Sequence, residues 1–411
     1  MFDAEGYLRS LEPLGWRFGL ERMRKLVSAL GMPQHRFASV HVVGTNGKSS
    51  VSEATTALLE AHGVRAGAYL SPHLDRFSER VRLGGAEIAS GEFAAAVERV
   101  AQAVEVVDRT LEEGDRVTQF EAATAAAFVA LAAARVEVGV IEAGLGGRLD
   151  ATNVLPSRIT ALTSIGLEHT QWLGETELEI AAEKLAVLRD HSTLILGEVS
   201  AQVEELARRT AAERHASVVP VRGLSDAVDL LSPAPYARAN FAVALACVDV
   251  VVSELDPGHV REVAASLSLA ARAEVIDAEP PMILDAAHNP QGAAALAQAL
   301  PGLSGGRPVI ACLAVLEDKD VGGIVRALAP AVSGLVATEV PSEALVGVGR
   351  PGARTVRANA LATLAREAGV GQVGEEVDPA VAIGRARALA VECGGAVAVC
   401  GTHYLLSYAR G

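Results

Sequence analysis

Cysteine is scarce in this sequence of 411 residues, and the spacing of the cysteines argues against a disulfide-rich protein and against a zinc protein. The four cysteines are Cys247, Cys312, Cys393 and Cys400, and they form no CxxC pair and no metal-type spacing. Neither a disulfide framework nor a zinc site is therefore indicated. We expect reduced thiols, as in a cytoplasmic protein.

Basic residues are also few compared with acidic residues. Lys and Arg number 36 against 50 Asp and Glu, so the formal net charge is −14. Because the sequence has no Lys/Arg tract, we do not expect general binding to nucleic acid. An acidic protein can still bind an anionic nucleotide through a local site of amides, Lys, Arg or a metal ion.

Long apolar runs are missing as well. Residues 1–5 have neither the basic nor the apolar region of a signal peptide. The most alanine-rich stretch, residues 122–134, is interrupted by Thr124 and is too short to span a bilayer. We expect a cytoplasmic protein with no membrane segment, in which this stretch forms a buried helix.

The remaining composition predicts an α/β fold. Half of the residues are apolar and only 4% are aromatic, which suits alanine-rich helices packed on sheets. Short β-branched runs alternate with longer helical ones, a pattern typical of mostly parallel sheets wrapped by helices. We predict strands at 38–43, 65–70, 138–142, 159–164, 282–285, 309–313 and 396–400, and helices at 48–61, 91–112, 119–134 and 175–188.

The length indicates two domains. We expect an ATPase domain of the P-loop type at 1–269, with a mostly parallel sheet, and a smaller Rossmann-like domain at 270–411. The boundary follows from an irregular stretch at 221–240, a helical pair that ends near residue 269, and the strand–helix alternation that then restarts.

The strongest single motif is GTNGKS at residues 44–49, between a predicted strand and a predicted helix. Glycines let backbone amides converge on phosphate oxygens, and the helix N-terminus adds positive potential. Lys48 can reach the β- and γ-phosphates, and Ser49 can help to hold Mg²⁺. The strict pattern needs glycine where Val42 stands, and the alternative is an ordinary exposed turn.

Two further motifs follow predicted strands. Glu142 ends one of them, at the edge of the sheet where ligands of open α/β sheets bind, and a carboxylate there suits Mg²⁺. His169 closes the run SIGLEH at 164–169 and would lie beside Glu142 if the two strands are neighbours. The alternatives are a glycine-rich turn with a solvated Glu142 and a structural histidine.

Two other groups of polar residues are weaker indicators of a functional site. Glu183 and Lys184 lie on a predicted helix, where charges usually form a solvated face. Asp285 and His288 belong to the run DAAHNP at 285–290, at the end of the first strand of the second domain. The Asn-Pro pair alone signals a turn. Because Asp285 and His288 would face a domain cleft, we consider them site candidates.

Taken together and in this order, these motifs resemble the folylpolyglutamate synthase/dihydrofolate synthase family, a branch of the Mur ligase superfamily. The resemblance covers nearly the whole chain. It rests on GLER at 19–22, LGMPQ at 30–34, the loop at 44–49, SPHL at 71–74 with FSERV at 77–81, TQFE at 118–121, residues 144–153, the pair at 183–184, residues 285–290, DKD at 318–320 and GTHYL at 401–405.

The resemblance implies a role for each matching residue. ATP would bind to Asn46, Gly47, Lys48, Ser49, Asn240, Arg272, Asp285 and His288. Mg²⁺ would bind to Ser49, Ser71, Glu142 and His169. Lys184 would carry a carbamate and help to hold a second metal ion, and Lys48, Lys184 and His288 would be the catalytic residues. The pterin pocket would be formed by Gly19, Leu20, Glu21, Arg22, Thr118, Gln119, Phe120, Glu121, Leu149, Asp150 and Ala151.

The sequence departs from the family pattern at two of these positions. The run before Asn240 is YARA, where the family usually has a His-Gln pair. Arg272 stands in ARAE, where the family usually has Pro-Gly-Arg. Both assignments therefore rest on a weaker match than those of the first domain.

The resemblance implies the activity of an ATP-dependent ligase, and the alternatives are a cell-wall Mur ligase and a P-loop switch GTPase. The enzyme would add glutamate to dihydropteroate, to folylpolyglutamates or to both, through an acyl phosphate, with small-molecule partners only and as a monomer. A cell-wall Mur ligase is disfavoured by the signature at 71–81. A P-loop switch GTPase is disfavoured because no Asn-Lys-x-Asp motif is present. Asp150 could accept hydrogen bonds from a pterin, or it could cap a turn or helix.

Overall fold

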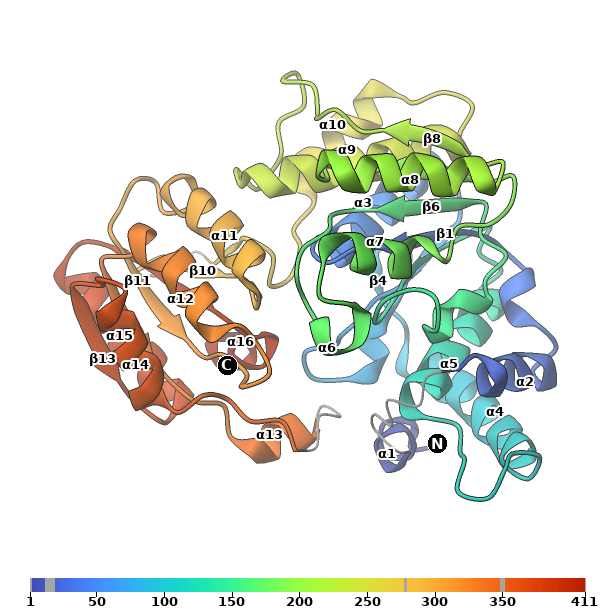
Figure 1. The fold of residues 1–411 in the computed structure, drawn as a ribbon, viewed down its shortest axis with the longest axis horizontal. Coiled ribbons are helices and arrows are strands. Elements are labelled where there is room, and N and C mark those ends of the chain that lie inside the picture. Colours follow the sequence, from blue (N-terminus) through green and yellow to red (C-terminus); the bar gives the residue numbers. More distant parts are fainter. Residues whose placement is uncertain (1, 12–18, 277–278, 348–351, 411) are drawn as a thin grey trace. The chain divides into compact units, whose positions relative to one another are not determined.

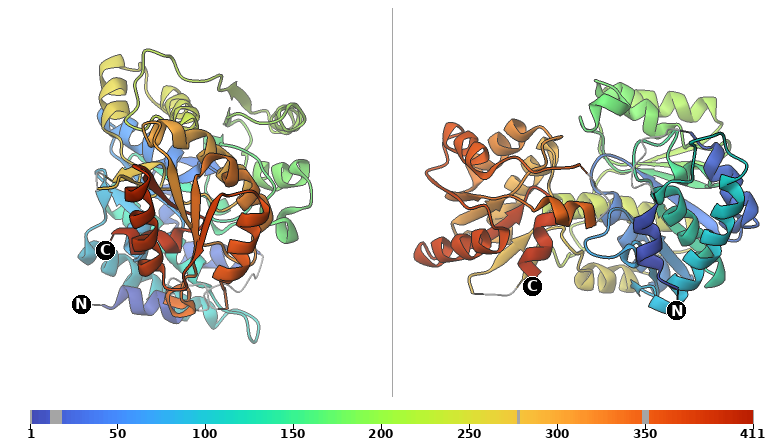
Figure 2. Two further views of the ribbon diagram at one scale, coloured as in Figure 1. Left: turned by 90° about the vertical axis from the view of Figure 1, so that its left-hand side faces the viewer. Right: turned by 90° about the horizontal axis from the view of Figure 1, so that it is seen from below.

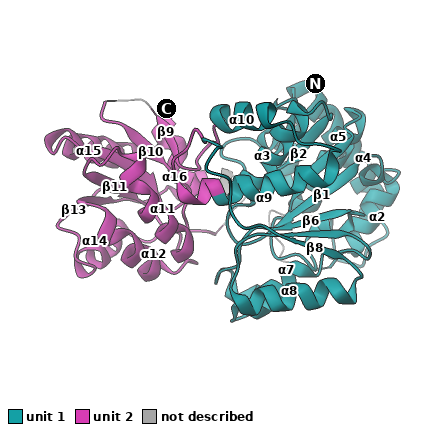
Figure 3. Ribbon diagram, turned by 90° about the horizontal axis from the view of Figure 1, so that it is seen from above, with its two compact units in different colours: residues 1–229, 239–267 teal, residues 230–238, 268–411 magenta. Residues whose placement is uncertain are grey.

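The structure, a computed structural model, describes residues 2–11, 19–276, 279–347 and 352–410. The chain forms two compact units (Figure 3), one made of Met1–Asp229 and Ala239–Leu267 and the other of Leu230–Arg238 and Ser268–Gly411. The predicted boundary at 269/270 is close to the second of these divisions. Residues 230–238, which we assigned to the first domain, belong to the second unit.

The first unit is built on an eight-stranded sheet with the order β4-β3-β2-β5-β1-β6-β7-β8. Strands β2, β5, β1, β6, β7 and β8 are parallel, and β3 and β4 form an antiparallel edge. The strands are β1 (Ala38–Val43), β2 (Ala66–Tyr69), β3 (Val81–Leu83), β4 (Ala86–Glu87), β5 (Val138–Glu142), β6 (Ile159–Leu162), β7 (Thr193–Leu196) and β8 (Ser217–Pro220).

Helices lie along both faces of this sheet (Figures 1 and 2). The helices of this unit are α1 (Ala4–Ser10), α2 (Glu21–Ala29), α3 (Lys48–Ala61), α4 (Ser90–Asp108), α5 (Gln119–Ala133), α6 (Thr170–Leu173), α7 (Glu177–Leu185), α8 (Ala201–Glu213), α9 (Pro235–Val251) and α10 (Pro257–Ser266), with short 3₁₀ turns η1 (Pro33–His35), η2 (Phe77–Arg80) and η3 (Ala151–Val154). Strands β1 and β5 are buried almost throughout because both faces of the sheet are covered.

The alanine-rich stretch forms most of the helix α5 and is buried up to residue 131, and Ala134 follows the end of the helix. Small alanines let α5 pack closely against α4, and side chains of both helices form one apolar core with Tyr69 and Ile141 of the sheet. Among the described residues, no helix combines the length and the apolar character that a membrane span requires.

The second unit is built on a six-stranded sheet with the order β13-β12-β11-β14-β10-β9, in which only the edge strand β9 is antiparallel. Its strands are β9 (Glu274–Ile276), β10 (Met282–Leu284), β11 (Val309–Leu313), β12 (Gly334–Ala337), β13 (Gln372–Glu375) and β14 (Ala396–Cys400). Its helices are α11 (Pro290–Leu303), α12 (Val321–Leu328), α13 (Ser342–Gly347), α14 (Ala358–Glu367), α15 (Pro379–Glu392) and α16 (His403–Arg410), with the 3₁₀ turn η4 (Ala329–Ala331). The predicted α/β class, with a mostly parallel sheet in each part, is confirmed.

Candidate active site

The loop at 44–49 connects β1 to α3, and its shape requires glycine at two positions. Gly44 and Gly47 have φ angles of 151° and 83°, which other residues rarely adopt. A Cβ atom on Gly44 would lie 1.9 Å from Oγ1 of Thr163, and one on Gly47 would lie 2.3 Å from Oδ1 of Asn240. The structure therefore brings Asn240 of α9 against the loop, beside the start of α3.

The end of β6 holds this loop in place. The amide of Thr45 donates to the carbonyl of Ser164 at 2.8 Å, and the amide of Asn46 donates to Oγ of Ser164 at 3.1 Å. The hydroxyl of Thr163 donates to the carbonyl of Asn46 at 2.6 Å. Thr163 and Ser164 were not predicted as site residues, although they end the strand predicted at 159–164 and Ser164 begins the SIGLEH motif.

Two lysines converge on one carbonyl of the loop. Nζ of Lys184, on α7, donates to the carbonyl oxygen of Gly44 at 2.8 Å, and Nζ of Lys48 donates to the same oxygen at 3.2 Å and to that of Thr45 at 3.0 Å. Lys184 is buried. Burial, followed by the charge of Lys48, lowers the pKa of Lys184 to about 7. A neutral amine is therefore accessible at Lys184 near neutral pH.

Glu142 joins the ends of three neighbouring strands. It is buried at the end of β5, between β2 and β1. Its Oε1 accepts from Oγ of Ser49 at 3.1 Å, and its Oε2 accepts from the backbone amide of Ser71 at 3.1 Å. Three predicted metal ligands thus lie together. Carboxylate and hydroxyl oxygens are the ligands that Mg²⁺ prefers, so this set fits the ion.

We expected His169 to lie beside Glu142 if their two strands were neighbours, and the two strands are not neighbours. Strand β1 lies between β5, which carries Glu142, and β6, which precedes His169. His169 occupies the position before α6 with a left-handed φ of 51°, and its Nε2 lies 3.8 Å from Oε1 of Glu168. His169 as a metal ligand stays a prediction. Among the described residues, no three His, Cys, Asp or Glu side chains are grouped as a metal site.

The signature at 71–81 forms a loop that two carboxylates organise. Glu79 accepts from the amides of Leu74 at 2.8 Å, Asp75 at 3.0 Å and Arg76 at 2.8 Å. Glu5 of α1 accepts from the amides of residues 77 and 78 at 3.1 and 3.3 Å. The backbone between Ser71 and Val81 is therefore held firmly at the edge of the sheet that carries Glu142.

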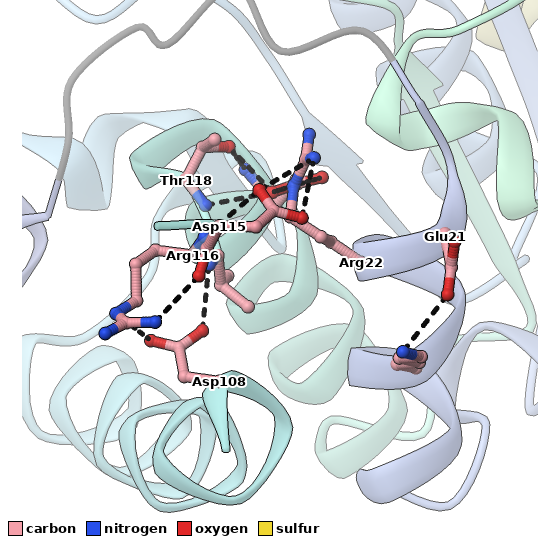
Figure 4. Close-up of polar contacts among 9 residues, drawn as sticks. Glu21, Arg22, Asp108, Asp115, Arg116 and Thr118 are labelled. Atoms are coloured by element: carbon pink, nitrogen blue, oxygen red, sulfur yellow. Dashed lines mark hydrogen bonds and ion pairs between the residues drawn. The ribbon is translucent and has the colours of Figure 1, made fainter. Parts of the chain in front are cut away.

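Several residues predicted for the pterin pocket contact one another (Figure 4). Nε of Arg22 donates to both carboxylate oxygens of Glu121, at 3.2 and 3.1 Å, and Nη1 donates to Asp115 at 3.3 Å. Glu121 also accepts from the amide and the hydroxyl of Thr118, both at 2.9 Å, which caps α5. This buried network links α2 to α5. A substrate role for Arg22, Thr118 and Glu121 stays a prediction.

Asp150 has the contacts of a capping residue. It precedes η3, and its carboxylate accepts from the amide of Leu145 at 2.8 Å, from the amide of Thr152 at 2.9 Å and from the hydroxyl of Thr152. Burial raises the pKa of Asp150. These contacts support the capping alternative. Recognition of a pterin by Asp150 stays a prediction that the structure does not favour.

The other residues of the predicted pterin pocket differ in their contacts and in their exposure. Phe120 packs over Gly144, where a Cβ atom would lie 2.4 Å from Cζ of the ring. The amide nitrogen of the Gln119 side chain donates to the carbonyl of residue 8 at 2.9 Å, which ties α5 to α1. Leu149 is 40% exposed. The remaining members are Gly19, Leu20 and Glu21, at the start of α2, and the buried Ala151.

In the second unit, Asp285 lies directly after β10 and accepts three hydrogen bonds. The donors are the hydroxyl of Tyr236 at 2.6 Å and the amides of Ala273 and Ala287, both at 2.8 Å. Tyr236 was noted in the sequence only as part of a departure from the family pattern. Burial, followed by the charge of Asp285, raises the pKa of Tyr236, which keeps its hydroxyl a donor.

His288 and Arg272 also belong to this part of the second unit. Nδ1 of His288 donates to the carbonyl of Ala286 at 2.7 Å, and the ring lies 5.5 Å from that of His403. Nη1 of Arg272 donates to the carbonyl of Ala271 at 3.0 Å. The nucleotide roles of Asn240, Arg272, Asp285 and His288 stay predictions.

Comparisons with known proteins agree with this geometry. The profile of the domain described as "Mur ligase, glutamate ligase domain" matches residues 271–403. The chain is 32% identical over 382 residues to the dihydrofolate synthase/folylpolyglutamate synthase of Mycobacterium tuberculosis, covering 84% of this chain and 77% of that protein.

Solved structures show the same likeness. The Mycobacterium tuberculosis folylpolyglutamate synthase complexed with ADP has a TM-score of 0.89 at 30% identity, covering 99% of this chain and 96% of that one. The Yersinia pestis bifunctional folylpolyglutamate synthase/dihydrofolate synthase, complexed with AMPPNP and Mn ion, has a TM-score of 0.82 at 28% identity, covering 98% and 96%. This chain therefore belongs to the dihydrofolate synthase/folylpolyglutamate synthase family of ATP-dependent ligases, within the Mur ligase superfamily.

Proposed function

We propose that this enzyme adds L-glutamate to dihydropteroate, to folylpolyglutamates or to both, at the expense of ATP. The observation that carries the proposal is the hydrogen bond between Ser49 and Glu142 at the carboxyl ends of β1 and β5, next to the glycine loop that Lys48 contacts. The names of the relatives support the choice of acceptors, since they are a dihydrofolate synthase/folylpolyglutamate synthase and a folylpolyglutamate synthase.

The chemistry explains why a phosphate loop is needed. A carboxylate is a poor acylating agent because its leaving group would be oxide, whereas an acyl phosphate has a good leaving group. Transfer of the γ-phosphoryl group requires mainly positioning and neutralisation of charge. Lys48 supplies positive charge at the loop, and the amides at the start of α3 supply hydrogen-bond donors. The amine of glutamate then attacks the acyl carbon, and phosphate leaves.

The residues around Glu142 would hold Mg²⁺. The carboxylate of Glu142 and the hydroxyl of Ser49 offer oxygen ligands, while Ser71 directs its backbone amide at the same carboxylate. Mg²⁺ bound there would neutralise charge on the phosphate oxygens, and waters would complete its coordination. A hydroxyl ligand from Ser71 would require its side chain, in place of its amide, to face the ion.

Lys184 is proposed to carry a carbamate. Only the neutral amine of a lysine reacts with carbon dioxide, and the lowered pKa of Lys184 makes that form available near pH 7. Carbamylation converts a cation into an anion, which suits a divalent metal and removes the repulsion between Lys184 and Lys48 at the Gly44 carbonyl. Nζ of Lys184 lies at the phosphate loop, where the carbamate would help to hold a metal ion.

The proposal also covers the other ligand contacts, the cellular compartment and the oligomeric state of the enzyme. We propose nucleotide contacts from Asn240 in the first unit and from Arg272, Asp285 and His288 in the second, and a pterin pocket near Phe120. We also propose a cytoplasmic monomer that binds neither nucleic acid nor membrane. The four cysteines are free thiols, as a reducing compartment requires, and size-exclusion chromatography with light scattering tests the monomeric state.

One experiment tests the activity. Purified enzyme, ATP, Mg²⁺ and glutamate are incubated with dihydropteroate or with tetrahydrofolate, and products are identified by mass spectrometry. We expect a mass increase of one glutamyl residue, together with the release of ADP and phosphate. Lys48→Ala is the control that retains the fold but loses the phosphate contact. No product with either acceptor from the folded wild-type enzyme would refute the proposal.

A further inference from the structure

Arg80 is a buried cation for which the described residues offer no carboxylate. It ends η2, and only 9% of it is exposed. Its Nε donates to Nδ1 of His73 at 2.8 Å, its guanidinium lies 5.2 Å from the centre of the Phe77 ring, and it also hydrogen-bonds to the hydroxyl of Tyr69. All three partners are neutral, and they leave part of the guanidinium available as donors.

The other arginines nearby have acidic partners. On the same loop, Nη2 of Arg76 lies 3.0 Å from Oε2 of Glu87, although this pair is largely exposed. Arg22 is the other arginine classed as buried among the described residues, and it pairs with two carboxylates, Glu121 and Asp115. A buried charge is costly to leave unpaired. The site around Arg80 is therefore suited to an anion that comes from outside the chain.

His73 adds a second unused donor to this site. It is 3% exposed, and because Nδ1 accepts from Arg80, the proton of the ring is on Nε2. Nε2 has no hydrogen-bond partner among the described residues. The guanidinium of Arg80 and the Nε2–H group of His73 thus lie together, and neither has a carboxylate partner among the described residues.

The site formed by Arg80 and His73 lies close to the proposed metal site along the chain. His73 is two residues from Ser71, whose amide contacts Glu142 at 3.1 Å, and two residues span at most about 7 Å. The contacts of Glu5 and Glu79 with the loop fix this spacing before any ligand binds. An anion at Arg80 would therefore be held at a preset distance from a carboxylate that reacts near Glu142.

We propose that Arg80, with His73, binds the second carboxylate of an acceptor that ends in glutamate. The inference rests on the proposed function. A terminal glutamate carries two carboxylates separated by four carbon–carbon bonds, about 5 Å when extended. One of them reacts at the phosphate, and the other reaches Arg80. Dihydropteroate ends in a single carboxylate, the one that reacts, so Arg80 is a specificity-determining residue for chain extension and not for the first addition.

Steady-state kinetics of Arg80→Met with two acceptors test this role. Loss of a buried, charge-assisted contact should raise KM for tetrahydrofolate roughly 10- to 100-fold. The KM values for dihydropteroate and ATP should change by less than about threefold, since neither substrate uses the contact. Arg76→Met is the matched control on the same loop, and it should leave both acceptors unchanged. Arg80→Lys should restore part of the affinity for tetrahydrofolate.

Calorimetry without ATP gives an independent readout. Wild-type enzyme should bind pteroylglutamate more tightly than pteroate, and Arg80→Met, or Arg80→Lys if the methionine variant does not fold, should reduce that difference. Equal effects on both acceptors, or equal affinity of the wild-type enzyme for both probes, would overturn the inference. A wild-type enzyme that uses dihydropteroate but never tetrahydrofolate would also overturn it and leave the proposed function standing. Failure with both acceptors would instead refute the proposed function.

Discussion

Replacement of Lys184 by methionine should stabilise the unmodified protein, and by an amount that depends on pH. Burial, and then repulsion from Lys48, lowers the pKa of Lys184 from its ordinary value of 10.5 to about 7. At 1.36 kcal/mol for each pH unit, the folded protein holds the ammonium form at a cost of about 5 kcal/mol. Methionine has a similar length and no charge, so it removes this cost.

The pH dependence follows from proton binding. Between pH 7 and pH 10.5 the folded state has lost the Lys184 proton while the unfolded state keeps it, so unfolding takes up a proton and stability rises with pH. Below pH 7 both states are protonated and the whole cost is present. The advantage of Lys184→Met should therefore be about 5 kcal/mol at pH 6 and about 2 kcal/mol at pH 9.

Urea denaturation followed by circular dichroism measures this difference, in buffers free of carbon dioxide and metal so that the amine stays unmodified. Groups other than Lys184 titrate in both proteins and cancel in the comparison. Lys25→Met is the control, since Lys25 is partly exposed and pairs with Glu21 at 3.1 Å, and its effect should stay below about 1 kcal/mol at both pH values. A methionine variant that is less stable at pH 6, or an advantage that does not change with pH, would refute the reasoning.

Five other substitutions have expected outcomes. Lys48→Ala should lower kcat at least about 100-fold, because a charge at the phosphates is lost; phosphate release and circular dichroism would show near-normal turnover in a folded variant if the loop were misassigned. Glu142→Gln and His169→Ala should each raise the Mg²⁺ concentration for half-maximal activity, and an unchanged Mg²⁺ titration would remove that residue from the metal site. Activity of Lys184→Ala should be partly restored by a small carboxylic acid such as acetate, whereas no rescue would argue against the carbamate. Asp150→Ala should lower the free energy of unfolding by about 1–2 kcal/mol through loss of the cap, and it should reduce kcat/KM equally for both acceptors; a loss confined to dihydropteroate would instead indicate a pterin contact.

The sequence alone determined the fold class and the place of the phosphate loop. Runs of β-branched residues separated by helical stretches specify parallel strands, and the carboxyl ends of such strands meet at one edge of a sheet. Residues at the end of a strand or in the loop after it, among them Glu142, Asp285 and the loop that leads to Lys48, could therefore be assigned to the edge at which a ligand binds. Local pattern was sufficient because each of these positions depends on its own strand.

Only the tertiary structure decided which strands are neighbours and which polar groups satisfy one another. Strand order depends on packing between segments far apart in the chain, and that order placed Ser71 beside Glu142 but separated β6, which leads to His169, by one strand. The partner of a buried polar side chain is likewise fixed by burial, which removes water as an alternative. This is why the carboxylate of Asp150 caps its own turn, and why Arg80, an unremarked residue of a recognised motif, proved to be a buried cation with neutral partners.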